Sequence, residues 1–295
     1  MPAPNARLRA VASQLSGTPL RGLLHSQVAI ITGGAQGIGR ACALLFAKEG
    51  AKVVVSDLDQ VKANGVVDEI REHGGEAIAV GGDVTAVDFP QKLVAATIEA
   101  FGDINILLNM AGFTADRMLH TTPDEVFQLM LDVHNVAPFR LIREVAPYMR
   151  NKDSAKSGQN RSIINVSSTS GLHGNVGQAN YATAKAGIQG LTKTVAKEWG
   201  PFGVRCNTVA FGYITTRLTQ AKEIGETISV GGQQIPLGIP SRGTHAQTDA
   251  SRVPDIPLGR PGIPEEAAQA CLFLASELSG YISGHTLEVT GGRGI

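Results

Sequence analysis

The chain has 295 residues and a mass of 30.9 kDa, enough to bury one large α/β core without a second domain. Lysine plus arginine and aspartate plus glutamate each number 26, so the formal net charge is zero and no basic surface favours nucleic acid. No apolar run approaches the roughly 20 residues that span a bilayer. The three widely spaced cysteines, Cys42, Cys206 and Cys271, fit buried thiols rather than a disulfide framework or a zinc site. We expect no nucleic-acid partner, no membrane partner and no metal.

Residues 1–26 precede the first strand pattern and are interpreted as an N-terminal arm. Arg7, Arg9 and Arg21, with no acidic residue, are typical of mitochondrial transit peptides, whereas the prolines and glycines of the same stretch favour a peripheral arm. Residues 27–295 contain no linker or repeat and are assigned to a single domain. We expect a cytoplasmic protein, with the mitochondrial matrix as the alternative location.

Short apolar, β-branched runs alternate with longer helical patterns along this domain. Strands are predicted at 28–32, 52–56, 77–80, 104–108, 162–166, 204–209 and 285–289, and helices at 38–49, 60–73, 88–101, 122–150, 180–199 and 264–276. Continuous apolar runs indicate strands buried on both faces, and hence a parallel sheet. The sequence therefore predicts an α/β fold of the Rossmann type, with helices on both faces of a doubly wound, seven-stranded parallel sheet.

A glycine-rich turn follows the first predicted strand directly, in the run Thr32-Gly-Gly-Ala-Gln-Gly-Ile-Gly39. Glycine lets the backbone approach a pyrophosphate closely, and the N-terminus of the next helix supplies free N–H groups and a positive dipole. Asp57 ends the second strand, where a carboxylate bonds the ribose hydroxyls of NAD and repels a 2′-phosphate; the alternative is a turn or helix N-cap residue. The pattern predicts a dinucleotide site that includes Gly33, Gln36, Gly37, Ile38, Gly39 and Asp57.

A tyrosine and a lysine in a predicted helix form the second candidate site. Tyr181 is followed four residues later by Lys185, and Ser168 lies thirteen residues upstream. Positions i and i+4 share a helix face, so the phenol and the ammonium point into one space. A positive charge so close favours phenolate and lowers the tyrosine pKa from about 10 toward the working pH. The trio predicts an acid/base centre; the alternative is a helix surface pair without chemistry.

Together these motifs resemble the short-chain dehydrogenase/reductase family over residues 25–293. The resemblance implies an oxidoreductase that interconverts a ketone and a secondary alcohol, in which Ser168 holds the substrate oxygen, Tyr181 supplies the proton and Lys185 binds the nicotinamide ribose. The matching motifs are Thr32-Gly-x3-Gly-x-Gly39, Asp83-Val84, Asn109-Met-Ala-Gly112, Ser168 and Tyr181-x3-Lys185, and the runs 174–187 and 257–292 are similar to the 3-oxoacyl-(acyl-carrier-protein) reductases of that family.

The resemblance also implies further contacts to the cofactor. Asp83 and Val84 would contact adenine, Asn109, Ala111 and Gly112 would line the groove, and Ile214 and Thr216 would touch the carboxamide. Members that prefer NADP often carry a basic residue where this chain has Gln36 or Asp57. NAD is therefore the expected cofactor, with NADP less favoured.

His134 stands where the family's catalytic asparagine is expected, and Asn135 follows one residue late. A shift of one residue rotates a helical side chain by about 100°, so Asn135 is not expected to substitute directly. Pro138 has no N–H to bond the carbonyl of residue 134, and we hypothesise that this carbonyl stays free to hold a proton-relay water near Lys185. The alternatives are a relay through the His134 ring and a histidine that serves only the core.

The segment 217–256 is rich in glycine and proline, and a loop of this length is either a functional lid or disordered. The resemblance implies that it covers the substrate. Lys222, Arg242 and Arg252 are candidates to receive an anionic carrier or coenzyme A phosphate, or else remain solvated. A 3-oxoacyl thioester is the leading substrate, with a steroid, polyol or sugar alcohol as the alternative. A non-catalytic dinucleotide-binding protein is less favoured. The resemblance implies a homotetramer or homodimer built through the helices at 122–150 and 180–199.

Overall fold

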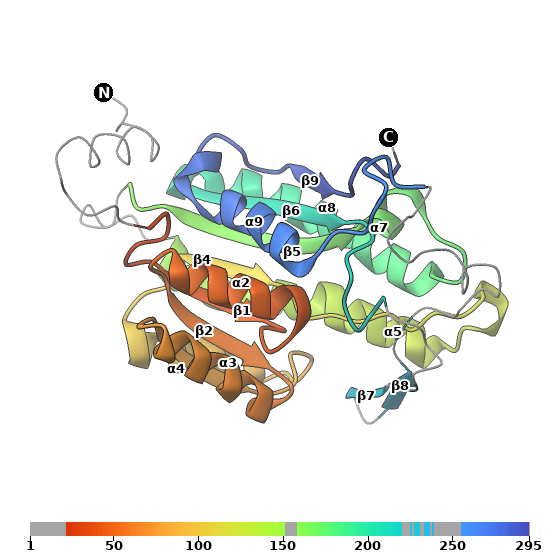
Figure 1. Cartoon of the computed structure of the whole chain (residues 1–295), viewed down its shortest axis with the longest axis horizontal. Coiled ribbons are helices and arrows are strands. Elements are labelled where there is room, and N and C mark those ends of the chain that lie inside the picture. Colours follow the sequence, from red (N-terminus) through yellow and green to blue (C-terminus); the bar gives the residue numbers. More distant parts are fainter. Residues whose placement is uncertain are drawn as a thin grey trace.

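The computed structural model describes residues 22–150, 158–219, 225, 227–230, 233–236, 238 and 255–294. At its centre lies a parallel sheet of seven strands in the order β3-β2-β1-β4-β5-β6-β9 (Figure 1). The strands are β1 (Val28–Thr32), β2 (Lys52–Asp57), β3 (Glu76–Gly81), β4 (Ile106–Asn109), β5 (Arg161–Ser168), β6 (Val204–Phe211) and β9 (Thr286–Val289). The predicted Rossmann-type, doubly wound fold is confirmed.

The strand order reverses between β1 and β4, which are neighbours although β2 and β3 come between them in the chain. Thr32 pairs with Asn109 at the carboxyl ends of these two strands. At such a switch point the connections after the two strands lead to opposite faces of the sheet and leave a crevice between them. The glycine-rich turn after β1 and the segment after β4 lie on the two sides of this crevice.

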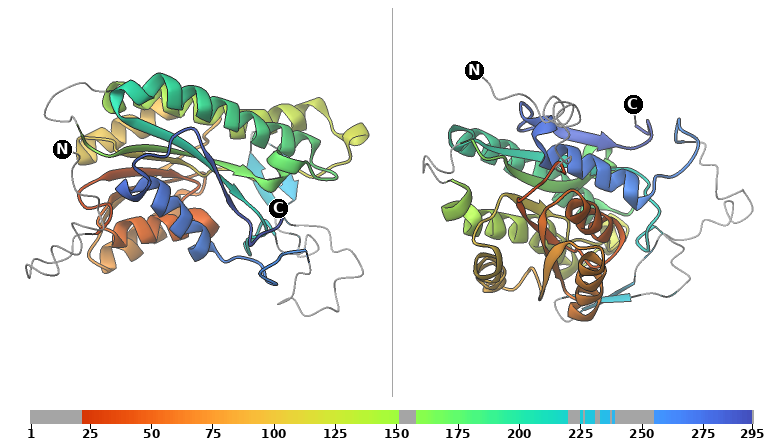
Figure 2. Two further views of the ribbon diagram at one scale, coloured as in Figure 1. Left: turned by 90° about the horizontal axis from the view of Figure 1, so that it is seen from above. Right: turned by 60° about the vertical axis from the view of Figure 1, so that its left-hand side comes forward.

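Helices cover both faces of the sheet, as Figure 2 shows from above. One face carries α2 (Gly37–Lys48), α3 (Gln60–Glu72) and α9 (Pro264–Ala275), and the other carries α4 (Phe89–Phe101), α6 (Ala137–Met149) and α8 (Ala179–Trp199). An apolar cluster fills each interface, with Cys42 and Cys271 buried in the first and Cys206 in the second. The prediction of buried free thiols is confirmed for all three cysteines. No helix among the described residues is long and apolar enough to cross a bilayer.

The helix predicted at 122–150 contains a distortion in its middle. It consists of α5 (Asp124–Leu131), a π-helical turn at Asp132–Val136, and α6. The N–H of Ala137 donates to the carbonyl of Asp132, five residues back, instead of the usual four. Pro138, in the first turn of α6, has no N–H to continue the regular pattern. The wider turn places His134 and Asn135 beside the start of α8.

Shorter elements connect the main helices and strands. They are α7 (Thr169–His173), a two-stranded antiparallel hairpin of β7 (Thr227–Val230) and β8 (Gln233–Pro236), and 3-10 turns at Leu119–Thr121, Gly200–Phe202 and Glu277–Ser279. The hairpin belongs to the predicted substrate segment 217–256, most of which lies outside the described residues. Residues 1–21 of the predicted arm also lie outside them, whereas Leu24 is buried in the core.

Candidate active site

The glycine-rich turn is packed too tightly for any side chain larger than hydrogen at two positions. A Cβ at Gly33 would lie 2.8 Å from the Cα of Ala111, and a Cβ at Gly39 would lie 2.0 Å from the carbonyl oxygen of Gly33. Gly37 has a positive φ of 54°, and a Cβ there would be in ordinary contact with the Thr216 methyl, 3.6 Å away. The turn thus closes onto the segment after β4 and leaves its backbone exposed to the pocket, as a bound pyrophosphate requires.

The pocket beside this turn contains most of the predicted cofactor residues. Gly33, Gln36, Gly37, Ile38, Gly39, Asp57, Asp83, Val84, Ala111, Gly112 and Thr216 line it. Asp57 is buried at the end of β2, and its carboxylate accepts hydrogen bonds from the N–H groups of Ala35 and Asp59, each at 3.1 Å. Asp59, rather than Asp57, caps helix α3. Asp57 therefore joins the glycine-rich turn to the loop after β2 and still lines the pocket.

Four predicted cofactor residues do not line this pocket: Asn109, Ile214, and the pair Tyr181 and Lys185, which line the second pocket. The side chain of Asn109 is buried and donates to Oδ1 of Asn165 at 2.8 Å, because the two residues are partners in the register of β4 and β5. Ile214 lies instead in the second pocket, where it forms an isolated bridge with Gly262. In the structure Asn109 joins two strands, and Ile214 lines the pocket that adjoins the first one; the contact of Ile214 with the carboxamide stays a prediction.

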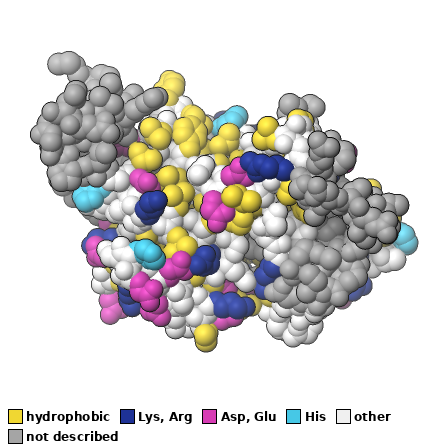
Figure 3. Space-filling model, viewed as in Figure 1, with side chains coloured by type: hydrophobic (Ala, Val, Ile, Leu, Met, Phe, Trp, Pro, Cys, Tyr) yellow, Lys and Arg dark blue, Asp and Glu magenta, His cyan; other side chains and the backbone are white. Residues whose placement is uncertain are grey.

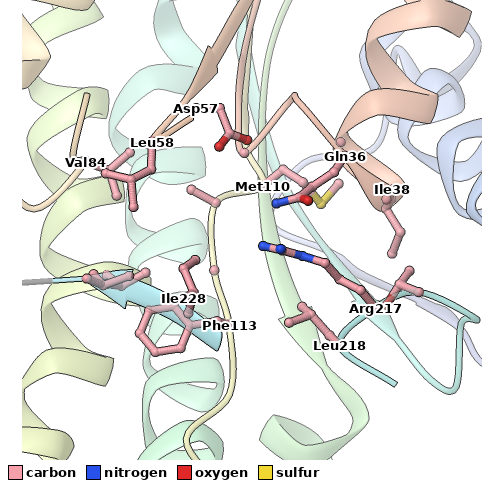
Figure 4. A pocket seen from close by; sticks show the side chains of 18 of the residues that line it. Gln36, Ile38, Asp57, Leu58, Val84, Met110, Phe113, Arg217, Leu218 and Ile228 are labelled. Carbon is pink, nitrogen blue, oxygen red and sulfur yellow. The ribbon is translucent and has the colours of Figure 1, made fainter. Parts of the chain in front are cut away.

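Several lining residues were missed because they come from the predicted loop. Arg217 and Leu218 follow Thr216, and Ile228 and Val230 come from strand β7. Figure 4 shows the Arg217 side chain extending into the pocket, with Ile228 and Phe113 together on another wall. The alternation of Ile228 and Val230 within a short β-branched run was the one sequence signal for this wall.

A second pocket adjoins the first and holds the predicted acid/base trio, Ser168, Tyr181 and Lys185. Ser168 ends β5 and caps α7, where its hydroxyl oxygen accepts from the N–H of Ser170 at 3.2 Å. Tyr181 stands in the first turn of α8, half-buried, and lines the same pocket as Ser168. The pockets share Ile38, Met110, Gly112, Phe113, Thr216 and Leu218, so a ligand in one touches the walls of the other.

Lys185 is buried one helical turn after Tyr181. Its ammonium donates to the carbonyl of Val166 at 2.8 Å and lies 5.5 Å from the centre of the Tyr181 ring. Burial lowers the pKa of Lys185 to about 7, because the apolar surroundings disfavour the charged form. The ammonium thus lies beside the Tyr181 ring, while its hydrogen bond goes to the backbone of β5.

The expected lowering of the Tyr181 pKa is not what the structure shows. Burial raises the pKa of Tyr181 to about 12, the hydrogen bond with Ser168 opposes that shift, and the charge of Asp116 adds to it. The prediction considered only the lysine and left out the desolvation of the phenolate, which is the largest cause of the shift. At neutral pH the phenol therefore holds its proton.

Asp116, Gln178 and Ser170 form a hydrogen-bonded network that reaches Ser168, and no sequence motif indicated it. Both carboxylate oxygens of Asp116 lie 3.0 Å from Nε2 of Gln178, and Oε1 of Gln178 accepts from the Ser170 hydroxyl at 2.7 Å. Ser170 in turn bonds Ser168 through its backbone. The network connects the loop after β4 to the turn that carries the Ser168 hydroxyl.

The His134 ring packs against Tyr181 edge-on, with 5.3 Å between ring centres. Its Nε2 donates to the carbonyl of Phe113 at 2.9 Å, and Nδ1 is enclosed without a hydrogen-bond partner. Burial, then the charge of Lys185, lowers the pKa of His134 well below its ordinary value, so the ring is neutral. Because Nδ1 has no surface that water can reach, this geometry favours a packing role for the ring over a relay through it.

Asn135, one residue later, turns toward helix α8. Its Nδ2 donates to the carbonyl of Ala184 at 2.9 Å, next to Lys185, so it joins the π-helical turn to the catalytic helix. As predicted, the side chain of Asn135 points in a different direction from the side chain of His134. The free carbonyl of His134 opposite Pro138 stays a prediction.

Comparisons with known proteins identify the family of this chain. Residues 33–293 match a family described as Enoyl-(Acyl carrier protein) reductase. Together with the relatives below, this match shows that the chain belongs to the short-chain dehydrogenase/reductase family, and it is an oxidoreductase acting on CH–OH groups with a nicotinamide dinucleotide.

Curated relatives cover nearly the whole chain. A 3-oxoacyl-(acyl-carrier-protein) reductase of Thermotoga maritima is 37% identical over 269 residues, 91% of this chain and 98% of that protein. A (3R)-3-hydroxyacyl-CoA dehydrogenase of Canis lupus familiaris is 36% identical over 283 residues, 93% and 98% of the two chains. A solved short-chain type dehydrogenase/reductase from Mycobacterium marinum superposes with a TM-score of 0.76 at 31% identity, covering 92% of this chain and 96% of that one.

Proposed function

We propose that this protein reduces a 3-oxoacyl thioester to the 3-hydroxyacyl thioester with NADH, and catalyses the reverse oxidation with NAD. The observation that carries the proposal is that Ser168, Tyr181 and Lys185 line one pocket, which shares part of its wall with the dinucleotide pocket. The nicotinamide supplies or takes up the hydride. A protonated phenol beside a serine hydroxyl is what a carbonyl oxygen needs as it receives that hydride at carbon.

The two hydroxyl groups act on the same substrate oxygen. Ser168 donates a hydrogen bond to the carbonyl oxygen, and Tyr181, protonated at neutral pH because its pKa is about 12, transfers its proton to that oxygen. Lys185, with a pKa of about 7, is then the stronger acid and returns a proton to the phenolate through a bridging hydroxyl. The carbonyl of His134 holds the water that reprotonates Lys185.

NAD is the proposed cofactor because of the carboxylate at the end of β2. Asp57 is held by two backbone N–H groups and lines the pocket where the adenosine ribose would lie, so a 2′-phosphate would meet its negative charge. Asp57→Asn keeps an acceptor oxygen and removes the charge. The ratio of NADPH to NADH affinity should rise by about tenfold, as for loss of one close repulsion; an unchanged ratio would remove Asp57 from cofactor choice.

We favour a thioester substrate because several similar proteins are named as 3-oxoacyl reductases or 3-hydroxyacyl dehydrogenases. One relative supports a second class of substrate. A 2,5-dichloro-2,5-cyclohexadiene-1,4-diol dehydrogenase of Sphingobium indicum is 37% identical over 272 residues, so a cyclic secondary alcohol is the alternative. The test is to measure oxidation of NADH and reduction of NAD with a panel of acyl thioesters, cyclic diols, steroids and polyols. Tyr181→Phe is the control. Turnover of thioesters supports the proposal, and turnover of cyclic alcohols alone would replace it.

We also propose a homo-oligomer, either a tetramer or a dimer. Hydrophobic side chains gather on part of the face in Figure 3. Leu278 and Tyr281, which follow α9 in the chain, are both exposed. Phe139 is 46% exposed on α6, within the helices predicted to form subunit contacts. Such surface is costly to leave in water. Sedimentation of the protein as a monomer would contradict the proposal.

A further inference from the structure

Arg293 is an arginine beside the acid/base trio that the proposed mechanism does not use. It follows β9 in the chain and lines the second pocket, which contains the trio, but not the dinucleotide pocket. The other lysine or arginine among the described residues of that lining is Lys185, which donates to the carbonyl of Val166. Arg293 is exposed, and within the described part of the chain its guanidinium makes no hydrogen bond, ion pair or ring contact. Its charge is therefore free to meet a ligand in this pocket.

The register of three neighbouring strands relates Arg293 to the catalytic serine. Ser168 of β5 pairs with Phe211 of β6, and Phe211 pairs with Val289 of β9. Neighbouring strands lie about 4.8 Å apart, so the chain leaves β9 at the same edge of the sheet as Ser168, about 10 Å away. The crevice between β1 and β4 lies on the other side of β5. The turn that carries Arg293 thus begins on the side of Ser168 that is remote from the cofactor crevice.

This turn is closely packed between two other segments. Gly292 has a positive φ of 91°, and a Cβ there would lie 2.9 Å from Cγ of Pro257. A Cβ on Gly294 would lie 2.9 Å from Nε2 of His173, the last residue of α7. The backbone of Arg293 is therefore held between the segment before α9 and the end of α7, so its place on the pocket wall is a property of the fold.

We propose that Arg293 binds an anionic group of the substrate, at the end of the molecule that lies away from the reacting ketone. This inference rests on the proposed function, because it takes a 3-oxoacyl thioester as the substrate. The anion is a phosphate of the carrier arm or a carboxylate at the far end of the acyl chain, since guanidinium binds both groups through paired hydrogen bonds. Asp255 lines the same pocket, but within the described residues it forms no ion pair with Arg293.

Three substrates separate the two anions from the thioester chemistry that they share. They are the coenzyme A thioester of 3-oxobutanoate, the neutral N-acetylcysteamine thioester of the same acid, and the N-acetylcysteamine thioester of a 3-oxo acid with a terminal carboxylate. Arg293→Met should raise the KM of at least one anionic substrate by about 3- to 10-fold, as for one exposed bidentate charge pair. The kcat of that substrate and both constants of the neutral thioester should stay within about twofold of the native values. The substrate that responds identifies the source of the anion.

Two further variants and a salt series show whether the charge of Arg293 is the cause. Arg293→Lys keeps the charge and should recover part of the loss. Arg71→Met removes an exposed arginine of α3 that lines neither pocket, and it should behave as the native chain does. Added salt should raise the KM of the responding substrate more in the native chain than in Arg293→Met, because salt screens an exposed charge pair.

Two results would overturn the inference while the proposed function stands. One is an equal KM in the native chain and Arg293→Met for all three thioesters. The other is a rise in KM for the neutral thioester as large as the rise for the anionic ones, which would mean that the substitution disturbs the pocket as a whole. In both cases reduction of the neutral thioester by the native chain keeps the proposed function. A native chain that reduces none of the three thioesters with NADH would end the proposed function and this inference together.

Discussion

The imidazole of His134 lies directly against the backbone of Gly112: a Cβ on Gly112 would be 2.4 Å from Cε1 of the ring and 2.9 Å from Nδ1. Gly112 does not have a positive φ, so the contact, and not the backbone conformation, requires glycine here. The glycine of the motif after β4 therefore makes room for the ring that packs on Tyr181. The substitution at position 134 is accommodated by the cofactor loop.

Gly112→Ala should destabilise the protein by about 1–3 kcal/mol, because the methyl group must displace a buried ring. Urea unfolding gives the free energy of unfolding for this variant, for His134→Ala and for the double variant. The double variant should lose less than the sum of the single losses, since removal of the ring makes room for the methyl. Gly65→Ala, in an open position on α3, is the control and should be neutral or slightly stabilising. Additive losses would show that Gly112 and His134 do not clash.

Asp116→Asn should move the pH profile of alcohol oxidation to lower pH. The Asp116 charge raises the pKa of Tyr181, and oxidation needs the phenolate, so its removal makes the base available at lower pH. The other ionisable groups facing Tyr181 are His134 and Lys185, and neither is altered. The asparagine oxygen can still accept from Gln178, so the network through Ser170 remains.

The measurement is kcat/KM against pH for the native chain, Asp116→Asn and Asp68→Asn, which removes an exposed carboxylate on α3. The control should match the native profile. A profile for Asp116→Asn that overlays the native one, or moves to higher pH, would exclude an electrostatic effect of Asp116 on Tyr181.

The lowered pKa of Lys185 predicts that the protein becomes more stable as the pH rises. Its folded pKa of about 7 is below the ordinary 10.5, so between these values the unfolded chain binds the extra proton. The free energy of unfolding therefore rises with pH between about 7 and 10.5. Below about pH 7 the buried lysine is charged, and its destabilising effect is at its maximum. The free energy of unfolding of Lys185→Met minus that of the native chain should decrease by a few kcal/mol as the pH rises from 7 to 10. Loss of the hydrogen bond to Val166 changes this difference in free energy by the same amount at every pH. A difference in free energy that does not change with pH would mean that Lys185 is not desolvated.

Features set by neighbouring residues were predictable from the sequence. The seven strands follow from continuous β-branched runs, and the pairing of Tyr181 with Lys185 follows from helical spacing. Features set by contacts between distant segments were not. Asn109 faces Asn165 only because β4 and β5 are neighbours in register, and the Tyr181 pKa depends on a carboxylate 65 residues away. Arg217 enters the pocket through a turn joined to Gly262, which no local pattern indicates.

The most direct test of the account is a single-turnover measurement of hydride transfer from bound NADH to the best substrate of the panel, in the native chain and in Tyr181→Phe. The phenylalanine removes only the hydroxyl, so the dissociation constant for NADH should change by less than about threefold, while the rate of hydride transfer should fall by about 10²–10⁴-fold, the range expected for loss of a general acid. A Tyr181→Phe variant that transfers hydride within about threefold of the native rate would contradict the assignment of Tyr181 as the proton donor.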